Sequence, residues 1–483
     1  MFLAVMLLGL RRSNRLIVSL LVVSIVSASI SVDAAERRGG LRHPKNIIIM
    51  FADGATATQW ELGKYSARQL FNESFTVTDV VFRKGELGML STHPLDAYIT
   101  DSAAAASAMS TGYKVNNFAV SMSPDGKPYK TVMEAAKAAG KRLGLVTTAM
   151  VYDASPAAFS VHARSRSEFQ SIVDQYLALA PDVLLGGGAD YFLPSGSAGG
   201  KRSDSRDVMA AFAGRGYQVV RDTAQLNAAQ GSKLLGLFAD QDMDLEIDSD
   251  PHKQPTTAQM TAAALKALSR GSPRGFVLFV ENENPDTAGH AMDAAGLIKA
   301  LWAFDKAVQV ALEFQRKTRG ETLLIVCSDH ETGGLSPTYA RSGASPGSGA
   351  RVFSMGASHL KLIAGIGISI KQAADKLGRK PAPEVLDEML ARHFPGFILD
   401  ADLRETILNQ QPLERNFLYA TSGALSRMVA RQTGLYWGTS GHTSEPVVVG
   451  ALGPGARLFR GYQDNTDFGK NLHRLIDRSR TAR

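Results

Sequence analysis

The segment Asn46–Phe51 (NIIIMF) is a short apolar run that leads directly into Ala52-Asp53-Gly54. The run lacks the polar alternation of a half-exposed strand, which is typical of a strand buried on both faces of a parallel sheet. In such sheets ligands bind beyond the carboxyl ends of the strands. The segment therefore predicts a buried strand with a carboxylate, Asp53, at the end where function is expected.

Several other segments repeat this pattern. Gly275–Val280 (GFVLFV) ends at Glu281, and Leu323–Cys327 ends at Ser328-Asp329-His330. Further strand candidates and amphipathic helical patterns lie along the chain: Arg142–Thr148 followed by Asp153, Asp182–Leu185 leading into Gly186–Gly188, Pro446–Gly450 after His442, and the helical patterns Thr257–Ser269 and His290–Phe314. Strands that alternate with helices predict an α/β fold with a central, mainly parallel sheet and helices on both faces. The acidic residues at the strand ends, and His330, are then expected to converge at one edge of the sheet.

Length and composition indicate a large globular protein with an insertion. Its 483 residues are 45% hydrophobic and 20% charged, which excludes global disorder. The stretch Ser342–Ala350 (SGASPGSGA) predicts a flexible loop, and from about Ser358 to Arg431 the pattern is helical without a strand that ends in an acid. We therefore predict an inserted, mostly helical cap or lid region over about residues 338–434, beside the site.

The N-terminus is typical of a secretory signal peptide. Arg11, Arg12 and Arg15 precede the apolar run Leu16–Ile30, and small residues follow at Val32–Ala35. That run is shorter than the roughly twenty apolar residues of a membrane-spanning helix, and no other segment of the sequence is a better candidate. We predict a signal peptide at residues 1–35, a catalytic domain at 36–483, and an exported protein, periplasmic or secreted, without a membrane span in the mature chain. Whether the apolar segment is cleaved or acts as an anchor stays open.

The distribution of charge and the single cysteine exclude several classes of partner and site. The formal charge of +7 comes from scattered Lys and Arg without a basic run or a nucleic-acid motif, so no nucleic acid is expected as a partner. The single cysteine, Cys327, excludes an intramolecular disulfide and zinc sites built from cysteines. Because it ends an apolar run, we predict that it is buried and structural.

Histidines and carboxylates suggest a metal site. Asp286 and His290 are four residues apart, which places both on one face of a helix, and Asp329-His330 lie at a strand end. Together with His442 they form a ligand set without thiolates, which suits catalytic zinc, while Glu281 and Asp53 offer oxygen ligands that magnesium accepts. Each motif alone is common in proteins without a metal. Their joint position at strand ends favours a metal site.

A serine at a helix start supplies a candidate nucleophile. In Thr100–Ala108 (TDSAAAASA), Ser102 opens an alanine-rich helical segment and Asp101 lies at its cap. A hydroxyl at this position faces unpaired backbone N–H groups and the positive end of the helix dipole, which favours an alkoxide and a bound phosphate. The alternative is that Asp101 and Ser102 only cap the helix. The candidate metal ligands favour the nucleophile.

In this combination and order, the motifs resemble those of the alkaline phosphatases. The resemblance runs from about Asn46 to the end of the chain, and its DHETGG form is similar to the bacterial branch. The motifs that carry it are Asp53-Gly54, Asp101-Ser102 with the alanines that follow, Asp153–Ala158, Ser165-Arg166, Leu185–Gly188, Phe279–Glu281, Asp286 with His290, Ser328–Gly334, Gly441–Thr443 and Asp464–Asp467.

The resemblance implies two zinc ions and one magnesium ion as cofactors. Their ligands would be carboxylates, imidazoles and hydroxyls: Asp286, His290 and His442 for one zinc; Asp53, Asp329, His330 and the Ser102 oxygen for the second; and Asp53, Ser155 and Glu281 for the magnesium.

The resemblance also implies the reaction, hydrolysis of phosphomonoesters through a phosphoserine on Ser102. Arg166 would clamp two phosphate oxygens, a choice over Arg164 that the residues themselves do not make. Asp153 would hold magnesium-bound water or position Arg166. Relatives are often homodimers, so a homodimer is one possible assembly of this chain.

Departures from the family pattern leave alternatives. In Glu281–Asp286 (ENENPD), Glu283 adds a carboxylate on the magnesium side, and Thr287 stands where relatives often have Lys, His or Trp, which predicts a weakened second phosphate contact. A phosphodiesterase of the same superfamily shares the two-zinc core, although such relatives usually have a Thr nucleophile. A non-catalytic exported protein that binds phosphate or metal is a third reading. It predicts a lost nucleophile or ligand, and none is missing in this sequence.

Overall fold

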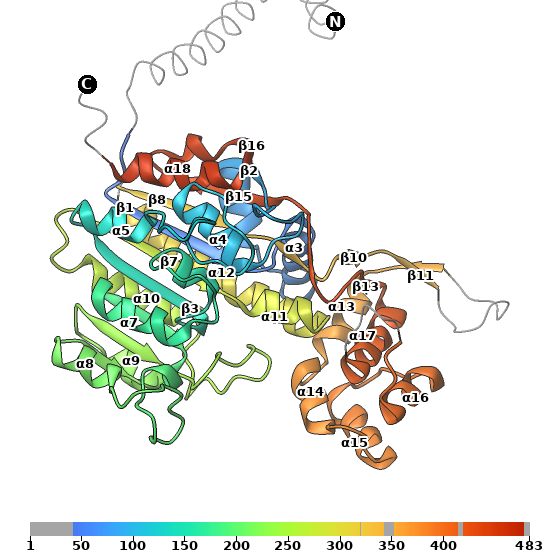
Figure 1. Cartoon of the computed structure of the whole chain (residues 1–483). Coiled ribbons are helices and arrows are strands. Elements are labelled where there is room, and N and C mark those ends of the chain that lie inside the picture. The colour runs from blue at the N-terminus through green and yellow to red at the C-terminus, as the bar shows by residue number, and fades with distance from the viewer. Residues whose placement is uncertain (1–41, 319, 342–351, 414–418, 478–483) are drawn as a thin grey trace, which may run out of the picture. The chain divides into compact units, whose positions relative to one another are not determined.

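A computed structural model describes residues 42–318, 320–341, 352–413 and 419–477 (Figure 1). The predicted signal peptide at 1–35 and the Gly/Ser-rich loop at 342–350 lie outside the described residues. Among the described helices, none has the length and apolar character that a membrane span requires.

A ten-stranded sheet forms the centre of the fold, and its order confirms the predicted architecture. The strands lie in the order β16 (Gly461–Asp464), β2 (Glu86–Ser91), β15 (Val447–Leu452), β8 (Thr322–Cys327), β1 (Asn46–Ala52), β7 (Phe276–Asn282), β3 (Arg142–Met150), β4 (Val183–Gly187), β6 (Leu234–Leu237) and β5 (Gln218–Val220). From β8 to β5 all neighbours are parallel, whereas β15 is antiparallel to both β8 and β2. The predicted strand after His442 is thus the antiparallel member of a mainly parallel sheet.

The register of the three central strands brings their ends together. Phe51 of β1 pairs with Glu281 of β7 on one side and with Cys327 of β8 on the other. Every residue of these three strands is buried, including Cys327, as the apolar runs predict. Chain segments that leave β1, β7 and β8 therefore start from one edge of the sheet, in adjacent positions.

Alternate side chains of β1 face two helical layers. Ile48 and Met50 belong to one buried cluster with Leu301 of α12 (Ala294–Lys317), which also includes residues of α10 (Thr257–Ser269) and α3 (Ala57–Phe71). On the opposite face, Phe51 contacts Phe159 at a centroid distance of 6.0 Å, next to α6 (Ala154–Ala158). The other helices of the core are α4 (Ser102–Thr111), α5 (Val132–Ala138), α7 (Phe169–Leu179), α8 (Val208–Gly214), α9 (Thr223–Ala228), α11 (Asn284–His290) and α18 (Asn465–Ile476).

The predicted long helix from His290 to Phe314 is wrong at its start. The chain forms two helices, α11 and α12, and Met292 between them has a left-handed φ of 54°. Asp293 begins the second helix as its N-cap, because its carboxylate accepts a hydrogen bond from Gly296 N at 2.8 Å. Asp286 and His290 consequently share the short helix α11 and not the start of the long one.

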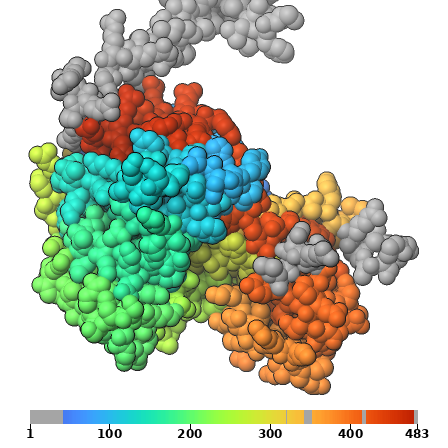
Figure 2. All heavy atoms as spheres, in the orientation of Figure 1, coloured from blue at the N-terminus to red at the C-terminus, as the bar shows by residue number. Residues whose placement is uncertain are grey.

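The segment predicted as a cap contains mostly helices in its described part. They are α13 (Ala357–Ala364), α14 (Ile370–Leu377), α15 (Pro383–His393), α16 (Ala401–Asn409) and α17 (Ala420–Thr433), drawn in orange to orange-red in Figures 1 and 2. A hairpin of β11 (Tyr339–Arg341) and β12 (Val352–Ser354) precedes them. A role of this segment as a lid stays a prediction.

Two short antiparallel ladders pair the chain that enters this segment with the chain that leaves it. In one, β10 (Leu335–Pro337) pairs with β13 (Leu435–Trp437). In the other, β9 (Glu331–Thr332) pairs with β14 (His442–Thr443), so that His442 lies opposite Thr332. The second ladder returns His442, which is remote in sequence, to the carboxyl end of β8.

Candidate functional site

The strand ends carry the acidic residues of the site. Asp53 follows β1, Glu281 lies near the end of β7, and Asp329 follows β8. All three side chains are buried, with relative exposures of 0–2%. Burial disfavours the charged form of a carboxylate, and it raises the pKa of Glu281 to about 8 and that of Asp329 to about 7. Three buried acids at adjacent strand ends need compensation by positive charge.

One candidate metal group consists of Asp286, His290 and His442. The i, i+4 spacing on α11 sets His290 Nε2 at 3.2 Å from Asp286 Oδ2. His442, delivered by β14, has its Nε2 at 3.1 Å from that of His290 and 3.6 Å from Asp286 Oδ1. One atom from each residue lies within 4.8 Å of the others, so all three can contact a single ion.

The hydrogen bonds of the two histidines direct their free nitrogens at one another. His290 Nδ1 donates to the carbonyl oxygen of Ser440 at 2.7 Å, and His442 Nδ1 donates to that of Thr100 at 2.8 Å. With Nδ1 as the donor, the neutral form of each ring presents a lone pair at Nε2, as a metal-binding histidine does. Burial lowers the pKa of His290, but the Asp286 carboxylate outweighs it and raises the pKa to about 9. The group thus favours a cation, whether a proton or a metal ion.

A second candidate group consists of Asp53, Asp329 and His330. His330 Nε2 lies 3.4 Å from Asp53 Oδ1 and 3.3 Å from Asp329 Oδ2. The two groups adjoin, because the rings of His330 and His442 stack at a centroid distance of 3.7 Å. Thr332 lies between them, with its hydroxyl donating to Asp286 and 3.3 Å from His330 Nδ1.

Polar atoms near Glu281 fit a third cation. Thr147 Oγ1 donates to Glu281 Oε2 at 2.5 Å. Among the described residues, the other oxygen of Glu281, the Ser155 hydroxyl and Asp53 Oδ1 are buried and make no well-aligned hydrogen bond, although Ser155 is close enough to Glu281 to lower its pKa and His330 Nε2 is 3.4 Å from Asp53 Oδ1. Buried polar atoms without well-aligned partners are rare and call for a ligand. A set made only of oxygens suits a hard ion such as magnesium.

Ser102 lies beside the second group. It is the first residue of α4, and its Oγ is 3.1 Å from His330 Nε2. Asp101 is the N-cap, because its Oδ1 accepts from Ala104 N at 2.9 Å. The predicted helix start is confirmed, and the hydroxyl faces the positive end of a fully buried helix.

Two carboxylates hold Arg166 next to this serine. Its Nη1 donates to Asp101 Oδ2 at 3.3 Å and its Nη2 to Asp153 Oδ1 at 3.0 Å. The backbone N–H of Arg166 donates to the carbonyl oxygen of Phe118 at 2.8 Å. Arg164 instead has its guanidinium beside Gly126, where an added Cβ would lie 3.2 Å from Nη2. Of the two arginines between which the sequence did not decide, Arg166 is the one that contacts Asp101 at the start of α4 and Asp153 at the start of α6.

The departures at Glu283 and Thr287 contact each other. Thr287 Oγ1 donates to Glu283 Oε1 at 2.7 Å, and Glu283 N donates to Thr148 Oγ1 at 2.9 Å. Burial, and the charge of Asp286, raise the pKa of Glu283. The Thr287 hydroxyl is thus engaged by a carboxylate.

Sequence reasoning missed the residues that orient the ligands. The hydroxyls of Thr147 and Thr332 and the carbonyls of Thr100 and Ser440 all contact candidate ligands. Thr100 and Thr332 lie inside the quoted motifs Thr100–Ala108 and Ser328–Gly334, but nothing in those motifs indicates that they contact a ligand. Thr147 and Ser440 lie outside the motifs, and their contacts with Glu281 and His290 span more than a hundred positions, which leaves no local pattern.

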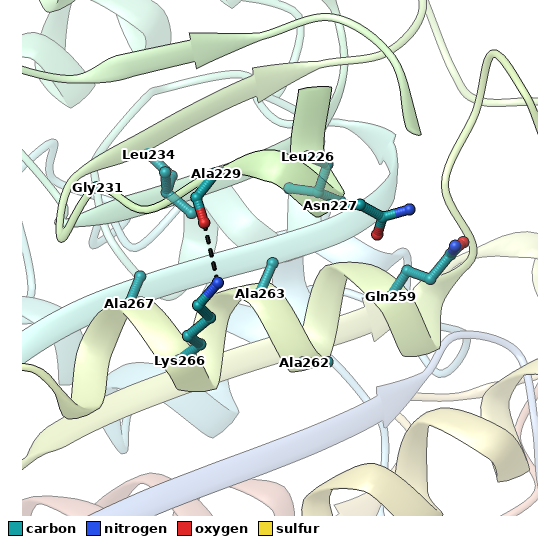
Figure 3. A pocket seen from close by; sticks show the side chains of 10 residues that line it. All are labelled: Leu226, Asn227, Ala229, Gly231, Leu234, Gln259, Ala262, Ala263, Lys266 and Ala267. Atoms are coloured by element: carbon teal, nitrogen blue, oxygen red, sulfur yellow. Dashed lines mark hydrogen bonds between the residues drawn. The ribbon is translucent and has the colours of Figure 1, made fainter. Parts of the chain in front are cut away.

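A cavity elsewhere in the molecule is unrelated to these groups. It lies between α9 and α10 and is lined largely by small apolar residues (Figure 3). Its one charged side chain, Lys266, donates to the carbonyl oxygen of Ala229 at 3.1 Å. No candidate site residue lines it.

Comparisons with known proteins agree on one family. Residues 44–477 match the family model of the alkaline phosphatases. Alkaline phosphatase 3 of Bacillus subtilis (strain 168) is 30% identical over 464 residues, covering 94% of this chain and 94% of that protein. The structure of Thermus thermophilus alkaline phosphatase is similar with a TM-score of 0.80 at 29% identity, covering 89% of this chain and 91% of that one. A cold-active alkaline phosphatase from a psychrophilic Shewanella species has a TM-score of 0.74 at 31% identity, covering 90% of this chain and all of that one.

Proposed function

This chain belongs to the alkaline phosphatase family and is a phosphomonoester hydrolase, and from that premise we propose that it acts through a phosphoserine on Ser102 with two zinc ions and one magnesium ion. The observation that carries the proposal is the position of the Ser102 hydroxyl, 3.1 Å from His330 and at the N-terminus of α4. A serine there has both a candidate metal group and a helix dipole to stabilise its alkoxide.

We propose the ligand sets from the donor chemistry of each group. Two groups combine imidazoles with carboxylates and the third contains only oxygens, which supports zinc in the first two and magnesium in the third. The ligands would be Asp286, His290 and His442 for one zinc; Asp53, Asp329, His330 and Ser102 for the other; and Asp53, Ser155 and Glu281 for magnesium. When bound, such ions stabilise the attacking and leaving oxygens of a phosphoryl transfer and lower the pKa of the serine hydroxyl.

The reaction then follows from the roles of the side chains. Ser102 Oγ attacks phosphorus, a new Oγ–P bond forms, and the bond from phosphorus to the leaving alcohol breaks. Water attacks the phosphoserine in a second step, which breaks the Oγ–P bond and releases inorganic phosphate. The planar fork of Arg166 is suited to two phosphate oxygens, and Asp101 and Asp153 hold that fork beside Ser102.

The substrate class follows from the parts of the substrate that the site contacts. The proposed ligands and Arg166 would contact only the phosphoryl group of the substrate. We therefore propose broad specificity for phosphomonoesters. The Thr287 hydroxyl donates to Glu283, which supports a weakened second phosphate contact. No contact in the described structure specifically favours a phosphodiesterase or a non-catalytic binding protein.

The test is hydrolysis of a generic aryl phosphomonoester at about pH 8–10. The rate is measured before chelation, after chelation and after zinc is added back, with Ser102→Ala in parallel. Activity that zinc restores in the wild-type chain, and that the variant lacks, is the expected result. Metal-loaded wild-type protein without monoesterase activity would contradict the proposal.

We also propose that the protein is exported, periplasmic or secreted, after removal of residues 1–35. The support is the arginine-flanked apolar segment of the sequence. N-terminal sequencing of protein recovered from the periplasm or the medium tests this. A mature N-terminus near residue 36 is expected, and full-length protein retained in the cytoplasm would contradict it.

A further inference from the structure

Glu331 follows His330 directly but belongs to neither metal group. Its side chain is fully buried, and both carboxylate oxygens accept two hydrogen bonds. Oε1 accepts from Gln59 Nε2 at 2.8 Å and from Leu335 N at 3.1 Å. Oε2 accepts from Gly334 N at 3.0 Å and from Thr443 Oγ1 at 2.6 Å. Four donors occupy the lone-pair positions of this carboxylate, so it is not available as a metal ligand.

The four donors come from three separate parts of the chain. Gln59 belongs to α3 of the core, Gly334 and Leu335 lead into the cap segment, and Thr443 lies on β14 where that segment returns. Glu331 and Thr443 are 112 positions apart. One buried carboxylate therefore connects three parts of the chain: helix α3 of the core, the residues that lead into the cap segment, and the strand β14 that follows it.

The return strand also delivers a metal ligand, because Thr443 is adjacent to His442. The backbone ladder that holds this strand, β9 with β14, is two residues long in each strand, and a bond from Gly333 N to the carbonyl oxygen of Gly441 at 2.9 Å extends it by one contact. Such a short ladder fixes position weakly without help from side chains. The Thr443 hydroxyl supplies that help, since a hydrogen bond to a buried carboxylate is short and strong.

We propose that Glu331 is a positioning residue for the metal group Asp286–His290–His442 and that it acts through Thr443. The inference rests on the proposed function in that this group holds zinc. The group Asp53–Asp329–His330 depends on Thr443 much less, because its three residues follow β1 and β8 of the central sheet. Loss of the bond from Thr443 to Glu331 should therefore weaken one zinc equivalent and spare the other.

Thr443→Val tests the proposal, because it keeps the shape of the side chain and removes the hydroxyl. The full chain is freed of metal, loaded with zinc and titrated with a chromophoric chelator, so that zinc affinity is read without substrate. Outer-shell partners of metal ligands typically change affinity about 10- to 100-fold when altered. We expect a loss of that size for one of two zinc equivalents, the same equivalent that His442→Ala weakens. Glu331→Gln should reproduce this pattern.

Gln59→Met is the matched control. It removes a different donor to the same carboxylate, from α3, and leaves the bond from Thr443 intact. It should lower thermal stability while both zinc affinities stay within about twofold of wild type, well below the effect expected for an outer-shell partner. Equal weakening by Gln59→Met and Thr443→Val would reduce Glu331 to a structural role and overturn the proposal, as would wild-type affinities in Thr443→Val. A wild-type chain that binds fewer than two zinc ions would overturn the proposed function as well, which distinguishes the two failures.

Discussion

Contacts with two carboxylates distinguish Arg166 from its neighbour Arg164. Asp101 caps α4 with one oxygen and accepts from Arg166 with the other, so the start of the helix and the proposed phosphate clamp depend on the same side chain. Burial opposes the charge of Arg166, but Asp153 and Asp101 outweigh burial and raise its pKa further. The guanidinium therefore stays charged throughout the working pH range.

Arg166→Ala removes this clamp and should lower kcat/KM for an aryl phosphomonoester by about 100- to 1,000-fold, the usual cost of a lost donor to transition-state charge. Affinity for inorganic phosphate as an inhibitor should fall in parallel. The matched variant is Arg164→Ala, two residues away, whose guanidinium lies beside Gly126. It should change neither value more than a few-fold, and equal effects in both variants would contradict the assignment of Arg166.

At the level of residues, the sequence predicted which side chains lie at the strand ends, but not which of two neighbouring arginines lies beside Ser102. Asp53, Glu281, Asp329 and His330 could be located because each ends or follows an apolar run. The choice between Arg164 and Arg166 depends on a loop in which the Phe118 carbonyl fixes the backbone of Arg166. No periodic pattern encodes such a contact, so only the resemblance to a family could decide it.

Among the helices and strands, the junction between α11 and α12 is a boundary that the hydrophobic periodicity did not predict. The apolar spacing that predicted the long helix lies within α12, and the predicted start at His290 falls in α11, which ends before the left-handed Met292, so that α12 begins after its N-cap Asp293. Asp293 Oδ1 caps α12, and Oδ2 accepts from Ile370 N at the first residue of α14. From the sequence, Asp293 could be recognised as an N-cap acid for α12. Its bond to α14 could not be predicted, because α14 is remote in sequence.

Asp293→Ala should lower the free energy of unfolding by about 2 kcal/mol, about 1 kcal/mol for each helix start that loses its acceptor. Urea unfolding followed by circular dichroism measures the loss. Asp375→Ala is the control, since Asp375 lies on α14 itself and its side chain is exposed. A wild-type midpoint in Asp293→Ala would show that the two helix starts do not depend on this carboxylate.

The same carboxylate predicts a pH dependence. Burial raises the pKa of Asp293 from 3.8 to about 6, so the folded protein holds a proton in a window where the unfolded chain has released it. The free energy of unfolding contributed by this group therefore falls as pH rises from about 4 to about 6. Asp293→Asn has no such proton, and its stability relative to wild type should rise across this window, by up to about 3 kcal/mol. A difference that stays constant from pH 4 to 7 would contradict the shift.

For the whole molecule, the fold brings the candidate metal ligands together. Seven candidate ligands, all at least partly buried except the exposed His290, come from four strand ends or ladders and one short helix: Asp53, Glu281, Asp286, His290, Asp329, His330 and His442. The sequence predicted the sheet because its strands are continuous apolar runs. It could not predict the two-residue ladder of β9 and β14, because pairing across more than a hundred residues leaves no local pattern.

Removal of metal should therefore destabilise the whole protein. Binding to the folded state alone stabilises by about 2.7 kcal/mol when free metal is 100 times the Kd. Chelation should lower Tm by several degrees, and zinc with magnesium should restore it. Ser102→Ala keeps all carboxylate and histidine ligands, so its Tm should respond to chelation nearly as that of wild type does. An unchanged Tm after verified metal removal would mean that the buried acids are compensated in another way.

The most direct test of the account is detection of the phosphorylated enzyme. The metal-loaded chain is mixed with an aryl phosphomonoester, quenched in acid within one turnover, digested and analysed by peptide mass spectrometry. We expect one added phosphoryl group on the peptide that contains Ser102, and none in Ser102→Ala. Turnover without a phosphoryl group on Ser102 at any quench time, or turnover that survives Ser102→Ala, would contradict the central claim.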